Sequence, residues 1–435
     1  MMKKAFLSVY LALAISSLAS DWQSQAPREE IAPTFSRNGE ELVIQASVRE
    51  GENGFWERSF PVVGGTWMQF SALKRGENLE HERRSAMVRL EFLDSDGKMV
   101  PIQEESVTRY FNRPGVPLSR PEFPRDQGQS NEVWAKVEDL YLVPEGATQA
   151  KVQLHLRWAP QGKITWKNVS LTQVEAPESR TARLAAVHLS PRSGESPKAN
   201  LQLYEPLIAE AAAQEADLVC LGECITIVGL GLDFADVAEP IPGPSTAYLG
   251  HLAKQHDFYI VAGLVERDAH LIYNVAVMMG PDGEVVGKYR KVTLPREEIA
   301  KGICPGSKYP VFETRFGKVG MMVCYDVFFP EVARKLSMNG AEVIAMPIWG
   351  GNPLLAQARA CENQVYLVSS TYTSHEDDWM KTGIWDREGR LVQQADEWGT
   401  VVVQEVDLAQ RTHWRFLGDF QARIAREGPI WEVEE

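Results

Sequence analysis

The hydrophobic positions along this chain follow two different periods. From about residue 30 to residue 175, apolar and polar residues alternate, as in "AKVQLHLRW" and in "KITWKNVSL", where Ile164 and Trp166 share one face. This period of two predicts half-buried β-strands. Because strand follows strand with no helical pattern between them, we expect an antiparallel all-β sandwich or jelly roll. The run "MVRLEFLDSDGKMV" predicts two strands joined by a Ser-Asp-Gly turn, and residues 109–131 predict a long loop.

A polar stretch at residues 173–183 ends this pattern, and a different one follows. The runs "RLAAVHLS" and "DLVCLGE" predict buried strands. The segment between them, "SPKANLQLYEPLIAEAAAQEA", predicts a helix because its apolar residues recur at near-helical spacing. Later runs such as "FYIVAGLVE", "EVIAMPI" and "NQVYLVSS" continue the series. Strands that alternate with helices predict a layered α/β domain.

Chain length agrees with two domains, because 435 residues are too many for one ordinary core. The N-terminal run "MMKKAFLSVYLALAISSLAS" has two lysines, an apolar stretch and then small residues, which is the layout of a secretory signal peptide. We therefore expect a signal peptide at 1–20, an all-β domain at 21–175, a linker at 176–182 and an α/β domain at 183–435. The protein is then exported to the periplasm or the extracellular space, and the signal peptide is removed.

The charge of the chain narrows the choice of partners. A formal net charge of -14 argues against nucleic acid and anionic membrane surfaces, which need a basic face. No later run is apolar enough to span a membrane. Small molecules and neutral polymers remain as partners.

The five cysteines, all in the second half, do not form a disulfide framework, because their number is odd. They do not form a metal site either, since Cys220 and Cys224 have no second pair of ligands at zinc spacing. We expect these two cysteines to be packing residues.

Three strand ends in the α/β half carry residues that a buried strand does not need. "GMMVC" ends at Cys324, "DLVCLGE" at Glu223, and "GKYRK" at Lys291. A free thiol has a pKa of about 8.5, which a neighbouring ammonium lowers, and a carboxylate can accept its proton. The ammonium can then hold an oxyanion together with a backbone N–H such as that of Tyr325. The three residues can thus supply a nucleophile, a base and a cation that stabilises the oxyanion.

These segments resemble the nitrilase superfamily of carbon–nitrogen hydrolases over about residues 182–430. "AAAQEADLVCLGE", "GKYRKVTLP" and "GMMVCYDVFFPE" are similar to the glutamate, lysine and cysteine motifs of that family, in the same order. One departure is Gly222, which precedes the glutamate where relatives usually have proline.

The resemblance implies Glu223 as general base, Lys291 as oxyanion stabiliser and Cys324 as nucleophile, with no metal and no organic cofactor. It places a second glutamate near Glu298, whose neighbour Glu297 is the competing choice. Trp349, in "MPIWGG", is either a wall of the substrate pocket or a core residue. The implied fold is a four-layer α-β-β-α sandwich that forms a homodimer through its outer helices.

The sequence leaves several alternatives for the reaction and for the role of the β half. "CYDVFFPE" is similar to amidase-type members, so we expect a small-molecule carboxamide or N-carbamoyl substrate, with nitrile hydrolysis as the alternative. A papain-like enzyme would need a histidine partner, for which His188 is one choice, but no motif orients it. The β half is expected to be an accessory module with a possible glycan or surface ligand, for which its tryptophans could stack. A glycan-binding protein without catalysis is the remaining alternative.

Overall fold

The computed structural model describes residues 21–103, 106–107, 121–126, 128, 130, 133–414 and 417–430. The expected signal peptide and most of the expected loop at 109–131 lie outside the described residues. The chain forms two compact units, the first from residues 1–104 and 113–176 and the second from residues 105–112 and 177–435. Each unit has its own core and is described by itself.

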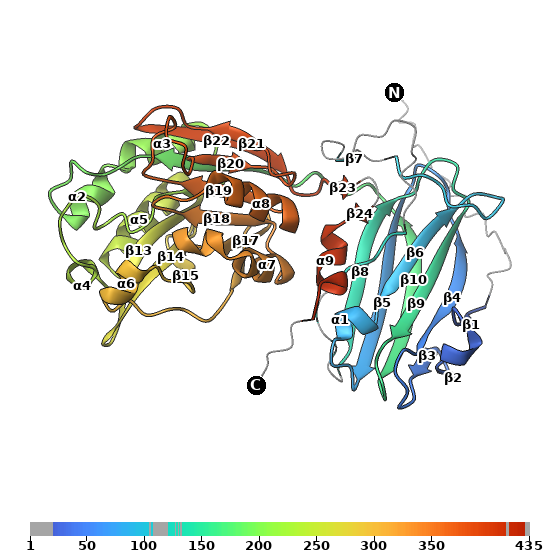
Figure 1. Ribbon diagram of the computed structural model, residues 1–435. Helices are drawn as coiled ribbons and strands as arrows, with labels where there is room; N and C mark the ends of the chain where they lie inside the picture. The colour runs from blue at the N-terminus through green and yellow to red at the C-terminus, as the bar shows by residue number, and fades with distance from the viewer. Residues whose placement is uncertain are drawn as a thin grey trace, which may run out of the picture. The chain divides into compact units, whose positions relative to one another are not determined.

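The first unit consists of two antiparallel sheets, as Figure 1 shows. One has the strand order β1-β4-β9-β6 and the other the order β2-β3-β10-β5-β8. Two short helices, η1 (Glu29–Ile31) and α1 (Glu82–Ser85), lie between strands. The strands are β1 (Gln23–Gln25), β2 (Thr34–Asn38), β3 (Glu41–Gln45), β4 (Asn53–Pro61), β5 (Trp67–Glu77), β6 (Val88–Leu93), β8 (Ala135–Leu142), β9 (Gln149–Arg157) and β10 (Lys163–Val174).

One core fills the space between these sheets, and the alternating pattern of the sequence supplies it. In β9, Val152 and Leu154 point into the core, and in β10, Ile164 and Trp166 do so; all four are fully buried. The second strand expected in "MVRLEFLDSDGKMV" does not form. After the turn at residues 94–98, Met99 forms an isolated bridge with Leu93 and the N–H of Val100 donates to the Phe92 carbonyl, and these residues are not part of a strand.

The second unit contains two six-stranded mixed sheets. The first has the order β15-β14-β13-β12-β11-β22, formed by β11 (Thr181–His188), β12 (Leu218–Cys220), β13 (Tyr259–Asp268), β14 (Leu271–Met279), β15 (Val285–Arg290) and β22 (Thr400–Asp407). The second has the order β16-β17-β18-β19-β20-β21, formed by β16 (Val311–Glu313), β17 (Lys318–Met321), β18 (Val343–Pro347), β19 (Tyr366–Ser370), β20 (Gly383–Trp385) and β21 (Leu391–Gln394).

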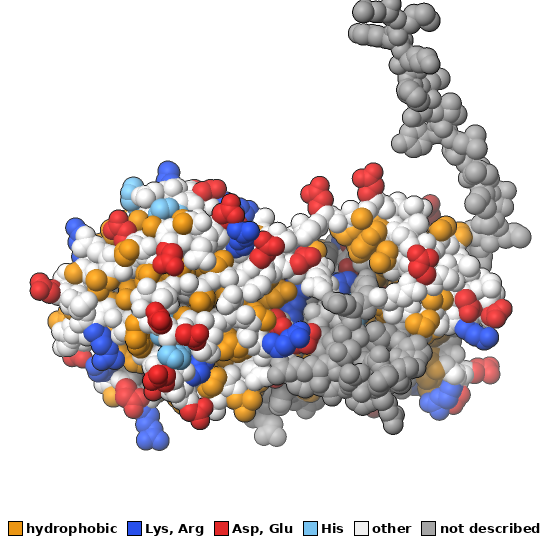
Figure 2. Space-filling model, turned by 90° about the horizontal axis from the view of Figure 1, so that it is seen from above, with side chains coloured by type: hydrophobic (Ala, Val, Ile, Leu, Met, Phe, Trp, Pro, Cys, Tyr) orange, Lys and Arg blue, Asp and Glu red, His pale blue; other side chains and the backbone are white. Residues whose placement is uncertain are grey.

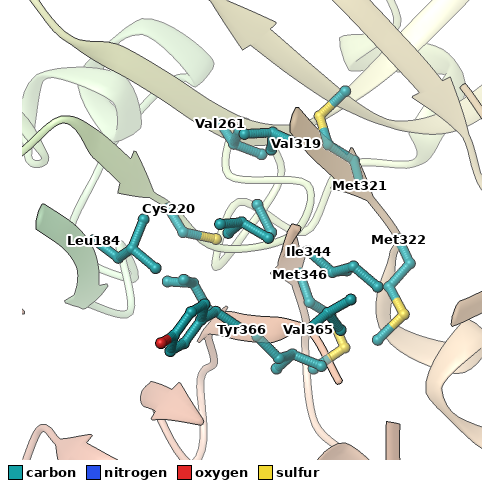
Figure 3. Packing of buried hydrophobic residues seen from close by; sticks show 14 of the residues in the cluster. Leu184, Cys220, Val261, Val319, Met321, Met322, Ile344, Met346, Val365 and Tyr366 are labelled. Carbon is teal, nitrogen blue, oxygen red and sulfur yellow. The ribbon is translucent and has the colours of Figure 1, made fainter. Parts of the chain in front are cut away.

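A shared hydrophobic core joins the two sheets, and helices pack on them from outside. Figure 3 shows Cys220 and Val261 of the first sheet close to Val319 and Ile344 of the second. The helices α2 (Pro197–Gln202), α3 (Glu205–Ala213) and α5 (Pro244–His256) bury apolar residues against the first sheet. The helices α7 (Pro330–Met338) and α8 (Pro353–Asn363) contribute to the core of the second sheet. Short helices α4 (Phe234–Val237) and α6 (Arg296–Ala300) lie in connecting segments.

The helix expected between β11 and β12 is broken into α2 and α3. The break precedes Pro206, which lies in the first turn of α3. Proline has no N–H to donate to the preceding turn and its ring clashes there, so it starts a helix more readily than it continues one.

A small third sheet in the second unit includes a strand from far earlier in the chain. β23 (His413–Trp414) pairs antiparallel with β24 (Gly418–Asp419) and parallel with β7 (Ser106–Val107), and α9 (Gln421–Glu427) follows. The expected all-β domain at 21–175 therefore includes a segment that belongs to the second unit. Among the described residues, no helix has the length and apolar character to cross a membrane. Acidic side chains are scattered over the face seen in Figure 2.

Candidate active site

Cys324 begins the 3₁₀ helix η2 (Cys324–Phe328), three residues after the end of β17. Its φ of 45° is uncommon for a residue with a side chain, which indicates a backbone held in place by its surroundings. Asp326 supplies part of this restraint. Its carboxylate accepts hydrogen bonds from the backbone N–H of Val323 at 2.9 Å, the hydroxyl of Tyr289 at 2.8 Å and the backbone N–H of Thr293 at 3.0 Å. The cysteine turn is thereby tied to the segment that carries Lys291.

Lys291 directly follows β15 and is fully buried. Its Nζ donates to Oε1 of Glu223 at 3.1 Å and to Oε1 of Glu298 at 2.6 Å. Glu297, in contrast, has an exposed side chain. Of the two neighbouring glutamates that the sequence offers, the structure therefore brings Glu298 to the lysine.

Glu223 lies just beyond β12 and is buried at 2% exposure. Its Oε2 accepts a hydrogen bond from the backbone N–H of Trp349 at 2.7 Å, and its backbone carbonyl accepts one from the hydroxyl of Tyr372, also at 2.7 Å. The tyrosine also explains the glycine that precedes the glutamate. A Cβ at Gly222 would lie 2.4 Å from the Tyr372 hydroxyl oxygen, too close for any side chain.

The charges of the site set the protonation state of the thiol. Burial raises the pKa of Cys324, and the negative charge of Glu223 raises it further, while Lys291 lowers it. Burial and the carboxylate together outweigh the ammonium, so the pKa of this thiol lies above its ordinary value. The resting cysteine is a protonated thiol whose proton must be removed as it reacts.

Lys291 remains an ammonium in this buried place. Burial lowers its pKa, but the charges of Glu223 and Glu298 more than compensate, so the pKa lies above its ordinary value. Burial raises the pKa of Glu298 above its ordinary value, and the negative charge of Glu223 raises it further, while Lys291 and the hydrogen bond from Asn274 lower it.

The two supporting residues lie beside this cluster. Tyr325 is half-buried, and its ring packs against those of Phe328 and Phe329. The side chain of Trp349 is 43% exposed, with its ring edge-on to that of Tyr372, so it is not a core residue. The Cys324 thiol lies 3.7 Å from the carbonyl oxygen of Gly350, the residue next to this tryptophan.

Sequence reasoning missed Asn274, a fully buried residue of β14 that touches both glutamates. Its Nδ2 donates to Glu223 Oε1 at 2.7 Å and to Glu298 Oε1 at 3.1 Å. The sequence did contain a signal for this residue. Asn274 lies on the same strand face as Ala276 and Met278, because it precedes them by even numbers of residues, and this face points into the core between the sheets. A lone amide at such a position in an apolar strand indicates a polar partner.

The contacts of His188 do not favour a histidine-assisted thiol. Its Nδ1 lies 2.7 Å from Thr382 Oγ1, and its ring stacks on that of Trp398. Burial lowers the pKa of His188 to about 4. Within the described part of the chain, no group of three or more His, Cys, Asp and Glu side chains could hold a metal ion.

The family comparison falls within this second unit. A model of the carbon–nitrogen hydrolase family matches residues 183–416, which include Glu223, Lys291 and Cys324. Omega-amidase NIT2 of Mus musculus is 33% identical over 250 residues, covering 52% of this chain and 89% of the relative. A nitrilase of Pyrococcus abyssi is 39% identical over 206 residues, covering 45% of this chain and 76% of the relative. Among solved structures, Nit3 of Saccharomyces cerevisiae, a member of branch 10 of the nitrilase superfamily, matches with a TM-score of 0.47 and 28% identity over 52% of this chain and 90% of that chain.

Proposed function

Because this chain belongs to the carbon–nitrogen hydrolase family of the nitrilase superfamily, we propose that it is an amidase that cleaves a non-peptide C–N bond of a carboxamide or N-carbamoyl compound. The observation that carries the proposal is the buried contact of Lys291 with Glu223 and Glu298, at 3.1 and 2.6 Å. The relative named omega-amidase supports the amide as substrate.

The proposed mechanism begins with the protonated thiol. As the substrate carbonyl approaches, Glu223 accepts the proton of Cys324, and the sulfur attacks the carbonyl carbon. Lys291 and the backbone N–H of Tyr325 stabilise the resulting oxyanion. The C–N bond then breaks, and Glu223 gives its proton to the leaving nitrogen, which departs as ammonia or an amine. A thioester on Cys324 remains.

Hydrolysis of the thioester reverses these roles. Glu223 takes a proton from a water molecule, which attacks the thioester carbon. The C–S bond breaks, the carboxylic acid leaves, and the proton returns to the sulfur. The two half-reactions consume water as their sole co-substrate, so these residues need no cofactor.

An unpaired oxygen favours an amide over a nitrile. Oε2 of Glu298 is buried and has no hydrogen-bond partner among the described residues. A buried acceptor without a donor is costly, and an amide or carbamoyl N–H can supply that donor. A nitrile has no N–H to give.

We expect a substrate panel to separate these classes. Ammonia release from primary carboxamides and N-carbamoyl compounds should exceed release from nitriles of the same acyl group by at least about tenfold in kcat/KM, since one buried hydrogen bond is worth that much. Glu298→Gln should lower the ratio of kcat/KM for amides to kcat/KM for nitriles. Faster turnover of nitriles by the unaltered enzyme would contradict the amide assignment.

The fold and assembly belong to the same proposal. We propose a four-layer α-β-β-α sandwich for the second unit, supported by the core between its two sheets and by the helices outside them. A homodimer through the outer helices is supported by exposed apolar side chains on and beside η2, α7 and α8, namely Phe328, Phe329, Met338 and Leu354. Export rests on the pattern of residues 1–20.

The first unit is proposed as an accessory module that adds none of the chemistry. Among its tryptophans, Trp56 and Trp166 are buried in the core, whereas Trp158 is 47% exposed and lies under the guanidinium of Arg157. An exposed indole of this kind can stack on a sugar, so a glycan or other surface ligand is the second candidate function.

A protein that begins at Arg180 is expected to fold and to hydrolyse a small amide with nearly the full-length kcat, because every proposed catalytic residue follows that point. It lacks β7, the partner of β23, so its melting temperature should fall by several degrees. Circular dichroism and ammonia release measure both effects. A fall in kcat of more than about a hundredfold in the folded protein would make the first unit part of the catalytic machinery.

A further inference from the structure

Asn274 and Cys224 form a second layer of contacts around the proposed catalytic residues. Two donors, Lys291 Nζ and Asn274 Nδ2, each contact the same two acceptors, Oε1 of Glu223 and Oε1 of Glu298. These four atoms alternate donor and acceptor in a closed ring. The backbone of Asn274 adds a further link, since its carbonyl accepts the N–H of Lys291 at 3.0 Å.

The ring brings together two carboxylates that would otherwise repel each other. One ammonium neutralises only one of the two charges, and burial strengthens the remaining repulsion. The amide of Asn274 supplies a second bridge between the carboxylates without adding charge. Removing it would leave Lys291 as the sole group that donates to both Oε1 atoms among the described contacts.

The orientation of this amide depends on Cys224. The Cys224 thiol donates to Asn274 Oδ1 at 3.4 Å. With the amide reversed, Oδ1 would face two carboxylate oxygens as a third acceptor, and Nδ2 would face the thiol, so both bridging hydrogen bonds of the amide would be lost. Burial and the nearby charges of Glu223 and Glu298 raise the pKa of the thiol, so it keeps the proton that it donates. Cys224 is therefore more than the packing residue that the sequence indicates.

The backbone supports the same arrangement. Cys224 has a φ of 46°, a left-handed conformation next to Glu223, and Ile225 N–H donates to the carbonyl of Gly263 at 3.0 Å. This turn directs the Glu223 carboxylate and the Cys224 thiol toward the same residue of β14.

We propose that Asn274 is a positioning residue that holds Glu223 and Glu298 in their working geometry. The thiol of Cys224 fixes the orientation of the Asn274 amide. The inference rests on the proposed function for the role of Glu223 as base. It adds a pair of residues that touch the base and its partner, and not the substrate.

The test is the pH dependence of kcat/KM in full-length Asn274→Ala and Asn274→Asp variants. The hydrogen bond from Asn274 lowers the pKa of Glu298, so its loss favours proton binding by the carboxylate pair at higher pH. The acid limb of the profile should move up by about one pH unit in Asn274→Ala, a tenfold loss of rate on that limb. In Asn274→Asp the new side chain has nearly the same shape as asparagine but adds a third carboxyl group. The acid limb of its profile should therefore move further than in Asn274→Ala.

Cys224 offers a matched pair of variants and a control. Cys224→Ser keeps a donor and should retain the unaltered pH profile, whereas Cys224→Ala should shift it in the same direction as Asn274→Ala, by less. Cys220→Ala is the control for lost packing, since Cys220 is a buried thiol of the preceding strand whose own hydrogen bond goes to the Leu221 carbonyl. Its profile should not move. Identical profiles for Cys224→Ser and Cys224→Ala would overturn the role of the thiol.

A readout without substrate separates this inference from the proposed function. The rate at which iodoacetamide alkylates Cys324, followed by mass spectrometry against pH, should show the same shift in Asn274→Ala. If no amide is hydrolysed but the alkylation profile shifts, the positioning role stands and the substrate assignment fails. If the unaltered enzyme hydrolyses amides and neither Asn274 variant shifts either profile, the positioning role fails. Should Asn274→Ala not fold, Asn274→Asp and Cys224→Ala decide by the same criteria.

Discussion

Cys324→Ala is expected to lose amide hydrolysis by roughly 10⁴-fold or more in kcat, because no other group can form the thioester. The protein should still fold, since alanine keeps the Cβ and loses only the contacts of the thiol, such as the one to the Gly350 carbonyl. Ammonia release from a primary carboxamide and thermal unfolding measure the two effects.

Two other cysteines serve as controls for this result. Cys220→Ala and Cys361→Ala should keep most of the activity. Burial raises the pKa of Cys220 to about 12, so it stays an unreactive thiol. Iodoacetamide should label Cys324 fastest, because Glu223 can remove its proton as the reagent approaches. Turnover by Cys324→Ala near the original rate would remove the proposed mechanism.

Lys291→Met is expected to lose activity by about a thousandfold and to lose stability as well. The activity falls because the oxyanion loses its charged donor. The stability falls because Glu223 and Glu298 become buried carboxylates without a cation, and breaking such a pair typically costs about 3–5 kcal/mol of unfolding free energy. Urea denaturation measures this loss.

The loss of stability should depend on pH in a defined direction. Without the ammonium, which opposes the shift, burial raises the pKa of Glu298 in the folded protein further above its unfolded value. The penalty from this group is then fully present above its folded pKa and shrinks as pH falls and the group binds a proton. We expect a smaller deficit near pH 5 than near pH 8.

A second substitution separates stability from catalysis in this variant. Glu298→Gln added to Lys291→Met removes one of the two unpaired charges, so it should restore part of the stability and none of the activity. A stability deficit in Lys291→Met that grows as pH falls would contradict the buried charge balance described for this site.

The elements that the sequence predicted correctly depend on short-range pattern. The alternation in β9 and β10 and the strand ends at Glu223, Lys291 and Cys324 can be seen within about a dozen residues, because burial of one strand face imposes a period of two. The single helix expected between β11 and β12 was wrong for an equally local reason, since the apolar spacing outweighed Pro206. The prediction of a second strand after the Ser-Asp-Gly turn was wrong because a pattern of apolar residues does not by itself provide a partner strand.

The sequence by itself determined the all-β pattern of the first half, the α/β pattern of the second half, the family resemblance and the three candidate catalytic residues. The tertiary structure alone decided that Glu298 and not Glu297 meets the lysine, and that Trp349 holds Glu223 through its backbone. It also decided that β7 joins the second unit and that Asn274 bridges two carboxylates. The physical reason is distance. Hydrogen bonds, desolvation and charge coupling act over a few ångströms between residues that lie from 7 positions apart, as for Lys291 and Glu298, to 126 apart, as for Glu223 and Trp349, so no local pattern can encode which of them meet.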